Sequence, residues 1–381
     1  MINFQFDTVQ HIPYIFFGIL AILLLVQLYY ILFVYGKLAL YKVKSYKQNE
    51  SLPPASILIC AHNEQENLKQ FLPFILQQDY PDFEVIVVND YSTDETPWIL
   101  EDFKKQFAHL RVVEIKEHIK LKNSKKFALT LAIKAAKNDL LVMTDADCLV
   151  QSDQWLKEVA GAYNNQTEII LGYSPYIKKK GFLNKLIRFE TTHTAMSYLS
   201  YALKNDAYMG VGRNLSYLKS LFFKGKGFNA HMHIKSGDDD LFVNQNATSS
   251  NVKIAIHQDA HVYSNPKETW KSYYKQKARH SGASVVYKKR HQRMLGTQLI
   301  SAFLFYTLLI ICSLLFPSLW YITLTIYLLR LIAQYFVFTP IYRKLAVKDL
   351  LLWLVVLDAF YYYYICLNGI FNRKKKQQSW K

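Results

Sequence analysis

The sequence has little cysteine and lacks the glycine patterns of the common nucleotide-binding motifs. Its four cysteines, at positions 60, 148, 312 and 366, show no Cys-x-x-Cys or Cys/His ligand spacing, which argues against a zinc site and fits a reducing compartment. Neither Gly-x-Gly-x-x-Gly nor Gly-x-x-x-x-Gly-Lys-Ser/Thr occurs, which excludes a dinucleotide-type Rossmann site and a P-loop. Any nucleotide must therefore be held by carboxylates, a metal ion and lysine.

Long apolar runs with little or no charge lie near both ends of the 381-residue chain. Residues 12–35 carry no charge and match the roughly 20 residues that cross a hydrocarbon core. This run is too long for the apolar region of a signal peptide and lacks a small-residue cleavage site, so we predict a retained anchor. Residues 299–316, 319–338 and 350–371 are also apolar. A buried helix pair in a soluble domain would explain one such run, but several together predict transmembrane helices.

The chain is strongly basic, with a net charge of +17. The basic residues cluster beside the apolar runs: Lys37, Lys42, Lys44 and Lys47 follow the first, and Lys288, Lys289, Arg290 and Arg293 precede the second. Flanking lysine and arginine mark the cytoplasmic ends of membrane spans, so a membrane accounts for the charge better than nucleic acid does. We expect residues 50–290, which lie between the clusters, to be cytoplasmic.

The number of spans stays open. Three spans after a cytoplasmic domain would place the basic run 373–376 outside, against the charge rule. The last apolar segment would avoid this conflict if it lay in the membrane interface, which Asp358 and the tyrosines 361–364 allow. The alternative is that the region around Pro317 does not form a full hairpin.

Strand and helix patterns alternate through the middle of the chain. Apolar strand runs occur at residues 56–61, 83–90, 110–115 and 140–144, and helical spacing occurs at 64–77, 94–107 and 124–137. Asp94 is the expected N-cap of the second of these helices. Strands bounded by helices predict a mainly parallel sheet with right-handed crossovers, and ligands of such sheets bind at the carboxyl ends of the strands.

Acidic and polar residues follow three of the predicted strands: His62-Asn63-Glu64, Asn89 to Asp94, and Asp145 with Asp147. On one sheet edge they would line a crevice with carboxylates, and Asp145 and Asp147 would hold a hard divalent cation beside a phosphate. Taken alone, the Asp-x-Asp pair is also typical of a polar turn after a strand. Lys125 and Lys126 open the third helix, either as a phosphate site or as a solvated helix end.

Seven short motifs lie in one order between the apolar segments: Asn63-Glu64, Asp90 in Val88-Asn-Asp-Tyr-Ser-Thr-Asp94, Lys125 in Ser124-Lys-Lys-Phe-Ala-Leu129, Asp145-Ala-Asp147, Gly210-Val-Gly-Arg-Asn214, Gly237-Asp-Asp-Asp-Leu241, and Gln276-Lys-Ala-Arg-His280. With these motifs the chain resembles the family 2 glycosyltransferases, inverting enzymes with a GT-A fold, over about residues 54–283. Each motif is short, but seven in this order are hard to obtain by chance.

The resemblance implies a fold and a division of the chain. The fold is the α/β GT-A fold of nucleotide-diphospho-sugar transferases, a Rossmann-like mixed sheet with flanking helices, with transmembrane helices added. Residues 1–50 would form an N-terminal transmembrane anchor and basic linker, and 51–294 the cytoplasmic GT-A catalytic domain. Residues 295–381 would form C-terminal transmembrane or interfacial helices with a basic tail.

The resemblance also implies a role for each motif. The nucleotide-sugar-binding residues would be Asn63, Glu64, Asp90, Lys125 and Asp145, with Asp90 on the uracil and Lys125 on the diphosphate. The metal, Mg²⁺ or Mn²⁺, would lie on Asp147, and Asp145 would touch the metal or the donor's ribose. The catalytic residues would be Asp239 as general base, Asp238, Gln276, and Arg279 beside the departing phosphate. The acceptor side would contain Gly212, Arg213, Asn214 and His280.

Three positions depart from the family pattern. Ser124 stands where glycine is usual, and Asp238 stands where glutamate is usual. His280 replaces a tryptophan that lines the acceptor entrance in polymerising members, which favours transfer of one sugar over polymerisation.

Several of these residues have a second interpretation. The triple Asp238–Asp240 also suits a helix N-terminus, and its adjacent like charges should raise the pKa of at least one carboxyl group. We expect the histidines at 193, 231, 233, 257 and 261 at polar surfaces or behind the site, because Mg²⁺ and Mn²⁺ prefer oxygen ligands. The apolar spacing of residues 182–203 fits core packing or an interfacial helix, the latter because Lys185 and Arg188 lie on the same helix.

We therefore expect a metal-dependent inverting glycosyltransferase in the inner (plasma) membrane. It would move one sugar from a nucleotide-diphosphate sugar, with UDP as the expected nucleotide, to a lipid or lipid-linked acceptor at the cytoplasmic face. The runner-up is a processive polysaccharide synthase of the same family. A non-catalytic scaffold on the same fold is a third reading, which retention of all the expected acidic residues disfavours. Nucleic acid is not an expected partner.

Overall fold

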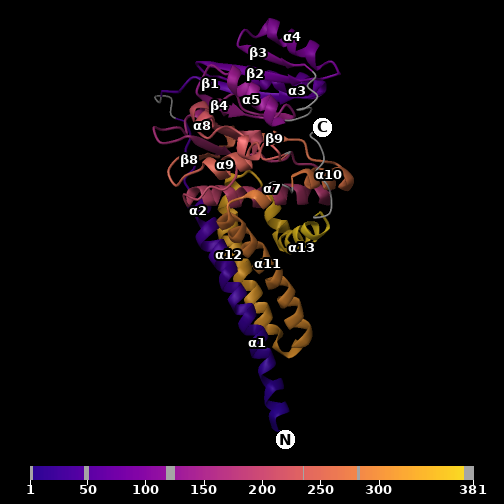
Figure 1. The fold of residues 1–381 in the computed structure, drawn as a ribbon. Coiled ribbons are helices and arrows are strands. Elements are labelled where there is room, and N and C mark those ends of the chain that lie inside the picture. Colours follow the sequence, from indigo (N-terminus) through magenta and orange to yellow (C-terminus); the bar gives the residue numbers. More distant parts are fainter. Residues whose placement is uncertain (1–2, 47–50, 117–124, 235, 281–283, 373–381) are drawn as a thin grey trace. The chain divides into compact units, whose positions relative to one another are not determined.

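A computed structural model of the chain describes residues 3–46, 51–116, 125–234, 236–280 and 284–372. The chain forms two compact units. The sheet unit contains residues 42–288, and the helical unit contains the residues up to 41 together with those from 289 to 372. Both units are drawn in Figure 1.

The sheet unit is built on a seven-stranded mixed sheet with the strand order β3-β2-β1-β4-β7-β6-β8. Its strands are β1 (Ala55–Ala61), β2 (Phe83–Asp90), β3 (Leu110–Ile115), β4 (Leu140–Met143), β6 (Ile169–Gly172), β7 (Leu215–Leu218) and β8 (Val252–Ala255). The first four are parallel, and β7 is antiparallel to both of its neighbours. A separate antiparallel pair joins β5 (Cys148–Val150) and β9 (Val262–Ser264). The predicted mixed α/β sheet is confirmed.

Helices cover both faces of the parallel half of the sheet (Figure 1). They are α3 (Gln65–Leu76), α4 (Thr96–Gln106) and α5 (Lys125–Ala135). Every residue of β1 is buried, as expected for a strand covered on both sides. Ile57 and Ile59 share a core with the apolar faces of α3 and α4. Leu58, which points to the opposite face by strand alternation, is also buried, and α5 packs against β1 and β2.

The N-cap of α4 is Glu95, so the predicted N-cap Asp94 is one residue too early, but the Asp94 side chain still binds the start of the helix. Its Oδ1 accepts a hydrogen bond from the backbone N–H of Thr96 at 3.0 Å, and its Oδ2 accepts one from the N–H of Gln65 at 3.2 Å. One carboxylate therefore fixes the first turns of both α3 and α4. These bonds to backbone donors lower the pKa of Asp94 by outweighing the effect of its burial.

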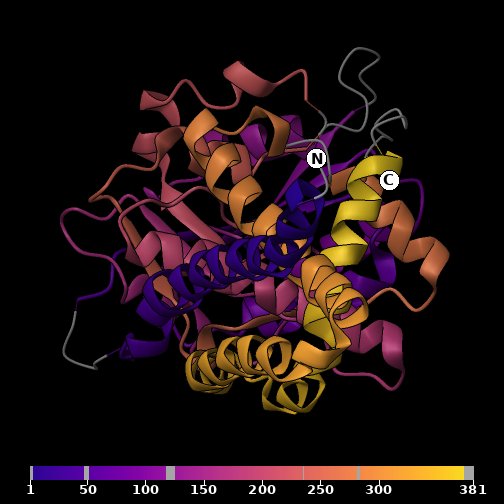
Figure 2. The ribbon, with the colours of Figure 1, turned by 90° about the horizontal axis from the view of Figure 1, so that it is seen from below.

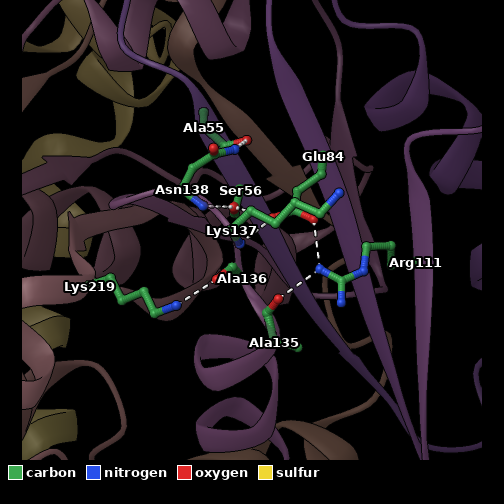
Figure 3. Close-up of polar contacts among 9 residues, drawn as sticks. All are labelled: Ala55, Ser56, Glu84, Arg111, Ala135, Ala136, Lys137, Asn138 and Lys219. Atoms are coloured by element: carbon green, nitrogen blue, oxygen red, sulfur yellow. Dashed lines mark hydrogen bonds and ion pairs between the residues drawn. The ribbon is translucent and has the colours of Figure 1, made fainter.

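A second polar network ties the amino ends of the strands, opposite the edge that carries the predicted site (Figure 3). Buried Glu84 on β2 accepts hydrogen bonds from the Ser56 hydroxyl at 2.7 Å and from the Lys137 N–H at 2.6 Å. Arg111 on β3 pairs with the same carboxylate at 3.0 Å. These contacts hold β1, β2, β3 and the end of α5 in register.

The rest of the sheet unit contains the helices α6 (Trp155–Ala160), α7 (Phe182–Leu203), α8 (Lys219–Lys224), α9 (Asp240–Asn246) and α10 (Trp270–His280). The bounds of α7 are those predicted from its apolar spacing. Most of its side chains are buried, so the core-packing interpretation of this helix is confirmed. Arg188 is buried too, so it does not mark an interfacial face, the alternative that the sequence left open.

The helical unit contains α1 (Asn3–Leu28), a π-helix (Tyr29–Tyr35), α2 (Gly36–Leu40), α11 (Lys289–Leu315), α12 (Trp320–Lys344) and α13 (Leu354–Asn372). Four stretches of it are long and apolar enough to cross a membrane: His11–Leu40, Lys289–Leu315, Pro317–Lys344 and Lys348–Leu367. Figure 2 shows α1 beside α11 and α12. A single turn, Pro317–Leu319, joins α11 to α12, so these two helices do form a hairpin.

A charged cluster is buried inside the helical unit. Arg330 of α12 and Asp358 of α13 form an ion pair at 2.9 Å, and each side chain is 1% exposed. Arg330 also donates to Gln27 of α1 at 3.0 Å and to the Tyr306 hydroxyl of α11 at 2.7 Å. Gln334 accepts a further bond at 2.9 Å. The cluster therefore connects all four long helices, and Asp358 is not the interfacial residue that the sequence suggested, because its charge is neutralised in the interior.

The π-helix lies between two residues that contact the same neighbouring helix. Gln27, before it, donates to the Ser301 hydroxyl of α11 at 2.8 Å, and Tyr35, at its end, accepts a bond from Gln298 of α11. Both partners lie within one turn of α11. The wider π turn places Gln27 and Tyr35 on the side of the segment that faces α11.

Candidate active site

Four loops meet at the carboxyl edge of the parallel strands. β1 and β4 are parallel neighbours, with Leu58 opposite Met143, so the segments that follow them share this edge. β7 is antiparallel to β4 and begins there, which brings in the turn Gly212–Asn214. The loops enclose a cavity of about 390 Å³. Nine of the predicted residues line it: Glu64, Lys125, Asp145, Asp147, Gly212, Arg213, Asp238, Asp239 and Gln276.

Lys125 connects two of the predicted acidic groups. Its Nζ lies 2.7 Å from Asp145 Oδ1 and 3.3 Å from Asp238 Oδ2, so one cation bridges the Asp-x-Asp segment and the acidic triple. Burial alone would lower the pKa of Lys125, but the two carboxylates outweigh it and raise the pKa well above its usual value. Lys125 therefore stays protonated across the range in which proteins are stable.

Asp239 is held by backbone donors at the base of the cavity. Its Oδ2 accepts a hydrogen bond from the Gly212 N–H at 2.7 Å, and its Oδ1 accepts one from the Asp240 N–H at 2.7 Å, at the start of α9. Burial, followed by the negative charges of Asp238 and Asp240, raises the pKa of Asp239 from 3.8 to about 7. A carboxyl group with this pKa is suited to accept a proton near neutral pH.

Glycine is needed at two positions beside this carboxylate. A Cβ on Gly212 would lie 3.3 Å from Asp239 Oδ2, which is tighter than an ordinary contact. Gly237, just before the acidic triple, has φ +93°, and a Cβ there would lie 2.5 Å from the Leu241 side chain. The close approach at Gly212 and the left-handed backbone at Gly237 together fix where Asp239 lies.

Lys126 has a different position from its neighbour. Its ammonium group is buried and donates to the carbonyls of His231 at 2.6 Å and Ile234 at 3.0 Å. Burial lowers its pKa to about 8. Lys126 therefore braces the segment that leads to Asp238, and the alternatives of a phosphate ligand or a solvated helix end are both wrong for it.

The residues of the Asp-x-Asp segment suit a hard divalent cation. Asp145, Asp147 and Cys148 each place a donor atom within 4.8 Å of the others. Burial raises the pKa of the Cys148 thiol, so its sulfur stays protonated, and the two carboxylates are the effective ligands. Oxygen donors facing a cavity are the ligands that Mg²⁺ and Mn²⁺ prefer, with water and phosphate oxygens completing the shell.

A second cluster of possible metal ligands contains Glu158, His257 and Asp259. Both oxygens of Glu158 already accept hydrogen bonds, from the Ser45 hydroxyl at 2.6 Å and the Tyr46 N–H at 3.1 Å. Glu158 therefore holds residues 45 and 46 in place within the sheet unit.

Three predicted residues lie outside the cavity lining. Asn63 has φ 54° and accepts a hydrogen bond from the Thr93 N–H at 2.8 Å, so it joins the loops that follow β1 and β2. Asp90 is buried, its pKa is raised by burial, and its Oδ2 has no hydrogen-bond partner among the described residues. Asn214 is buried and its amide donates to the carbonyls of Tyr173 and Ala260. Asn214 therefore supports the cavity wall from behind.

The last predicted motif lies on α10. Gln276 lines the cavity and donates to the Tyr176 hydroxyl at 3.2 Å. The guanidinium of Arg213 stacks on the Tyr176 ring, 4.6 Å from its centre, and donates to the Ser174 carbonyl at 3.3 Å. Tyr176 thus joins two predicted motifs. Arg279 and His280 end α10, but their side chains lie outside the described residues.

Sequence reasoning missed a set of residues that connect α7 with α10. Buried Glu190 of α7 accepts a hydrogen bond from the Tyr273 hydroxyl and pairs with Lys277 at 2.7 Å. All three line the cavity. The available signal was that Glu190 is the one acidic residue in the sequence of residues 182–203. Tyr287, which donates to Asp240 at 2.7 Å, had no comparable signal in the sequence.

Three of the five histidines considered above are buried rather than at a polar surface: His193, His231 and His261. Burial lowers the pKa of His231 and of His261 to about 4, so both imidazoles are neutral. Neither lies among the residues that line the cavity. The expected polar-surface position is therefore wrong for these three side chains.

A mixed sheet whose carboxyl edge carries an Asp-x-Asp segment, a bridging lysine and a buried acidic turn is the arrangement of GT-A nucleotide-diphospho-sugar transferases. Sequence comparison agrees, because residues 56–224 match the glycosyl transferase family 2 profile. Residues 56–224 of the chain therefore resemble the family 2 glycosyltransferases.

The chain is similar to several characterised proteins. It is 30% identical over 106 residues to a poly-beta-1,6-N-acetyl-D-glucosamine synthase of Staphylococcus epidermidis, a match covering 28% of this chain and 24% of that protein. It is 32% identical over 111 residues to a beta-monoglucosyldiacylglycerol synthase of a Nostoc species, covering 29% and 23%. These matches span about a quarter of the relatives' length.

The fold is similar to that of a solved structure. That structure is the mannosyltransferase PcManGT from Pyrobaculum calidifontis in complex with GDP-Man and Mn²⁺. The alignment covers 92% of this chain and 99% of that one, with a TM-score of 0.55 and 18% identity. At this identity the likeness concerns the fold.

Proposed function

We propose that this enzyme transfers a sugar from a nucleotide-diphosphate donor, with inversion, to a lipid or lipid-linked acceptor at the cytoplasmic face of a membrane. The observation that carries the proposal is the arrangement around Asp239. One cavity holds a carboxyl group with a pKa of about 7, the two metal-type carboxylates Asp145 and Asp147, and a lysine that bridges Asp145 and Asp238. Base, cation and anion-binding groups are therefore within reach of one bound substrate.

The transfer is a single displacement at the anomeric carbon. Asp239 accepts the proton of the acceptor hydroxyl while the oxygen forms its bond to the sugar. The bond between the sugar and the diphosphate breaks, and the electron pair leaves with the phosphate oxygen. One displacement inverts the anomeric centre, so an α-linked donor gives a β-linked product. Asp239 is positioned for this role by the Gly212 and Asp240 amides.

The diphosphate would be neutralised by Lys125 and by the cation that Asp145 and Asp147 hold. When bound, a divalent ion supplies Lewis-acid stabilisation of the charge that develops on the leaving phosphate. Lys125 already lies 2.7 Å from Asp145, so it can follow the phosphate without leaving the site. Arg279 is proposed to add a second positive charge from α10.

The nucleotide is proposed to be UDP, read by Asp90. The unpaired Oδ2 of this buried carboxylate is an acceptor for a ring N–H such as that of uracil. Guanine also offers ring N–H donors, and the solved mannosyltransferase holds GDP-Man. GDP-sugars are therefore the donors with which UDP-sugars must be compared.

The acceptor is proposed to be a lipid because the chain carries four helices long and apolar enough to span a membrane. The resemblance to a beta-monoglucosyldiacylglycerol synthase supports this class of acceptor. The basic residues beside these helices place the sheet unit on the cytoplasmic side in the proposal. Gly212, Arg213 and His280 are proposed to lie on the acceptor side, with Asn214 supporting them.

The direct test is a transfer assay on the purified full chain. UDP- and GDP-sugars are offered with a cell lipid extract and Mn²⁺ or Mg²⁺, and products are read by mass. We expect Asp239→Asn to lower the rate by about 10²–10⁴-fold, the usual value of a general base. Asp259→Asn, a half-buried carboxylate outside the cavity, is the control. Unchanged transfer by Asp239→Asn would exclude this residue as the base, and transfer only from GDP-sugars would exclude UDP.

A processive polysaccharide synthase is the second candidate, favoured by the resemblance to a poly-beta-1,6-N-acetyl-D-glucosamine synthase. The same assay separates the two. A product carrying one added sugar supports single transfer, and a ladder of long products supports polymerisation.

A further inference from the structure

The sheet unit exposes a surface of lysines and aromatic rings beside its cavity wall. We call it the lysine–aromatic surface, and its members are Lys178, Lys179, Lys180, Phe182, Trp270, Lys271, Tyr274 and Lys275. All are exposed, and the aromatic side chains Phe182, Trp270 and Tyr274 are 38%, 40% and 43% exposed. Rings of this size are usually buried, so three together on one surface indicate a contact.

This surface is one continuous feature built from two segments. Lys179, in the segment before α7, pairs with Glu268, just before α10, at 2.8 Å. The rings of Trp270 and Tyr274 stack along the outer face of α10 at 6.0 Å. The inner face of the same helix is fastened to α7, because Tyr273 and Lys277 both contact Glu190. The outer face of α10 is therefore presented by a helix that is firmly held.

The charge of this surface is unbalanced. Residues 178–182 and 268–275 contain five lysines and one acidic residue, Glu268. The exposed lysines Lys104 and Lys105 of α4, by contrast, are matched locally. On α4, Lys104 pairs with Glu101 at 3.5 Å and Lys105 pairs with Asp102 at 3.0 Å. Excess positive charge that is left exposed selects an anionic partner.

We propose that the lysine–aromatic surface binds the headgroups of anionic phospholipids. Amphipathic rings suit the boundary between water and hydrocarbon, and lysines on long flexible stems suit diffuse phosphate charge at that boundary. A small anion would need a cage of buried donors, whereas these side chains are exposed. Only eight residues separate the end of α10 from Lys289, where the first apolar helix after the sheet unit begins. This binding goes beyond sugar transfer and does not depend on it.

The consequence is that anionic lipid steadies α10. The inner face of this helix carries Gln276 into the cavity, and its outer face carries Trp270, Lys271 and Tyr274. A headgroup layer bound to the outer face would restrain the helix on which the last motif lies. Membrane composition would then influence the site through this one element.

Lysine footprinting of the full chain in lipid nanodiscs tests the proposal without any turnover. Reductive methylation is followed by mass spectrometry in neutral phosphatidylcholine and in discs that contain phosphatidylglycerol. We expect Lys178, Lys179 and Lys180 to be modified about tenfold more slowly in the anionic discs, since each lysine near such a surface gains appreciable binding energy. Lys104 and Lys105 report the change that disc composition alone produces.

Charge reversal sharpens the test. In Lys271→Glu/Lys275→Glu the protection of residues 178–180 should fall several-fold, whereas Lys104→Glu/Lys105→Glu, the matched control on α4, should leave it unchanged. Equal modification of residues 178–180 in neutral and anionic discs would overturn the proposal. So would protection by inorganic phosphate in neutral discs, which would reveal a small-anion site, or by an added acidic polypeptide alone, which would reveal a protein-binding surface.

Discussion

Two buried charge clusters among the described residues, one in each unit, have opposite character. In the helical unit, Arg330 and Asp358 balance each other, and Nε, Nη1 and Nη2 of the guanidinium group all donate to protein oxygens. In the sheet unit, Lys125 is shared by Asp145 and Asp238, and Asp239 lies close by with a raised pKa. The first cluster is neutral, and its guanidinium group is satisfied by the protein. The second has excess negative charge facing a cavity, as a site that takes up a cation and a proton requires.

The largest effect should come from breaking the balanced cluster. Arg330→Leu leaves Asp358 charged and unpaired in an apolar interior, which should lower the free energy of unfolding by about 3–5 kcal/mol. The double variant Arg330→Leu/Asp358→Leu removes both charges and should recover most of that loss. Thermal unfolding of the purified chain in detergent measures both. A double variant as unstable as the single one would show that the hydrogen bonds to Gln27 and Tyr306, rather than charge balance, stabilise the unit.

The unbalanced cluster should show itself in the pH dependence of transfer. Asp239 must be ionised to accept a proton, and its pKa is about 7. The rate should therefore fall about tenfold for each pH unit below 7 and level off above it. An acid limb near pH 4 would mean that Asp239 titrates as an ordinary carboxyl group.

The raised pKa of Asp239 also affects the stability of the fold, but with the opposite dependence on pH. The folded state binds this proton more tightly than the unfolded state, whose carboxyl pKa is 3.8. The stability contributed by protonated Asp239 is therefore full below pH 3.8 and is lost as the pH rises to about 7. Asp239→Asn should be at least as stable as the wild type at pH 8, although its transfer rate is far lower.

A smaller effect is expected where the cavity is held together by a buried pair. Glu190→Gln keeps the size of the side chain but removes its charge from Lys277 and weakens its bond to Tyr273. The orientation of α10 should loosen, and kcat/KM should fall about tenfold with little loss of overall stability. Glu268→Gln, which removes an exposed acid paired with Lys179, is the control in detergent. If Glu190→Gln lowers thermal stability and leaves kcat/KM unchanged, then Glu190 is structural only.

The strands and their shared edge could be predicted from the sequence. Continuous apolar runs bounded by polar turns define β1, β2 and β3 to within a residue, because strands covered on both sides need such runs. The segments that follow neighbouring parallel strands lie at the same edge of the sheet, so Glu64, Asp145 and Asp147 could be predicted to lie close together. That Lys125, Gly212 and Asp239 belong to the site was predicted from the family resemblance.

The partners of individual side chains could not be predicted. Lys125 and Lys126 are neighbours, but a helix turns about 100° per residue, so one faces the cavity and the other faces two backbone carbonyls. The sequence suggested that Asp358 lies in the membrane interface. Its partner Arg330 lies 28 positions earlier, and no local sequence pattern connects the two residues. Asn214 was assigned to the acceptor side from its motif. Its amide instead donates to two carbonyls that only the fold brings near.

The π-helix at Tyr29–Tyr35 should leave a trace in the evolutionary record of this chain. A π turn accommodates one residue more than an α turn, so the segment behaves as a one-residue insertion within a long helix. Deleting one residue from it would turn the π segment into ordinary α-helix, in which Gln27 and Tyr35 lie seven residues apart, still on the same side, and keep their partners Ser301 and Gln298. Alignments of this segment should therefore contain single-residue gaps in homologues that keep the residues at positions 27 and 301.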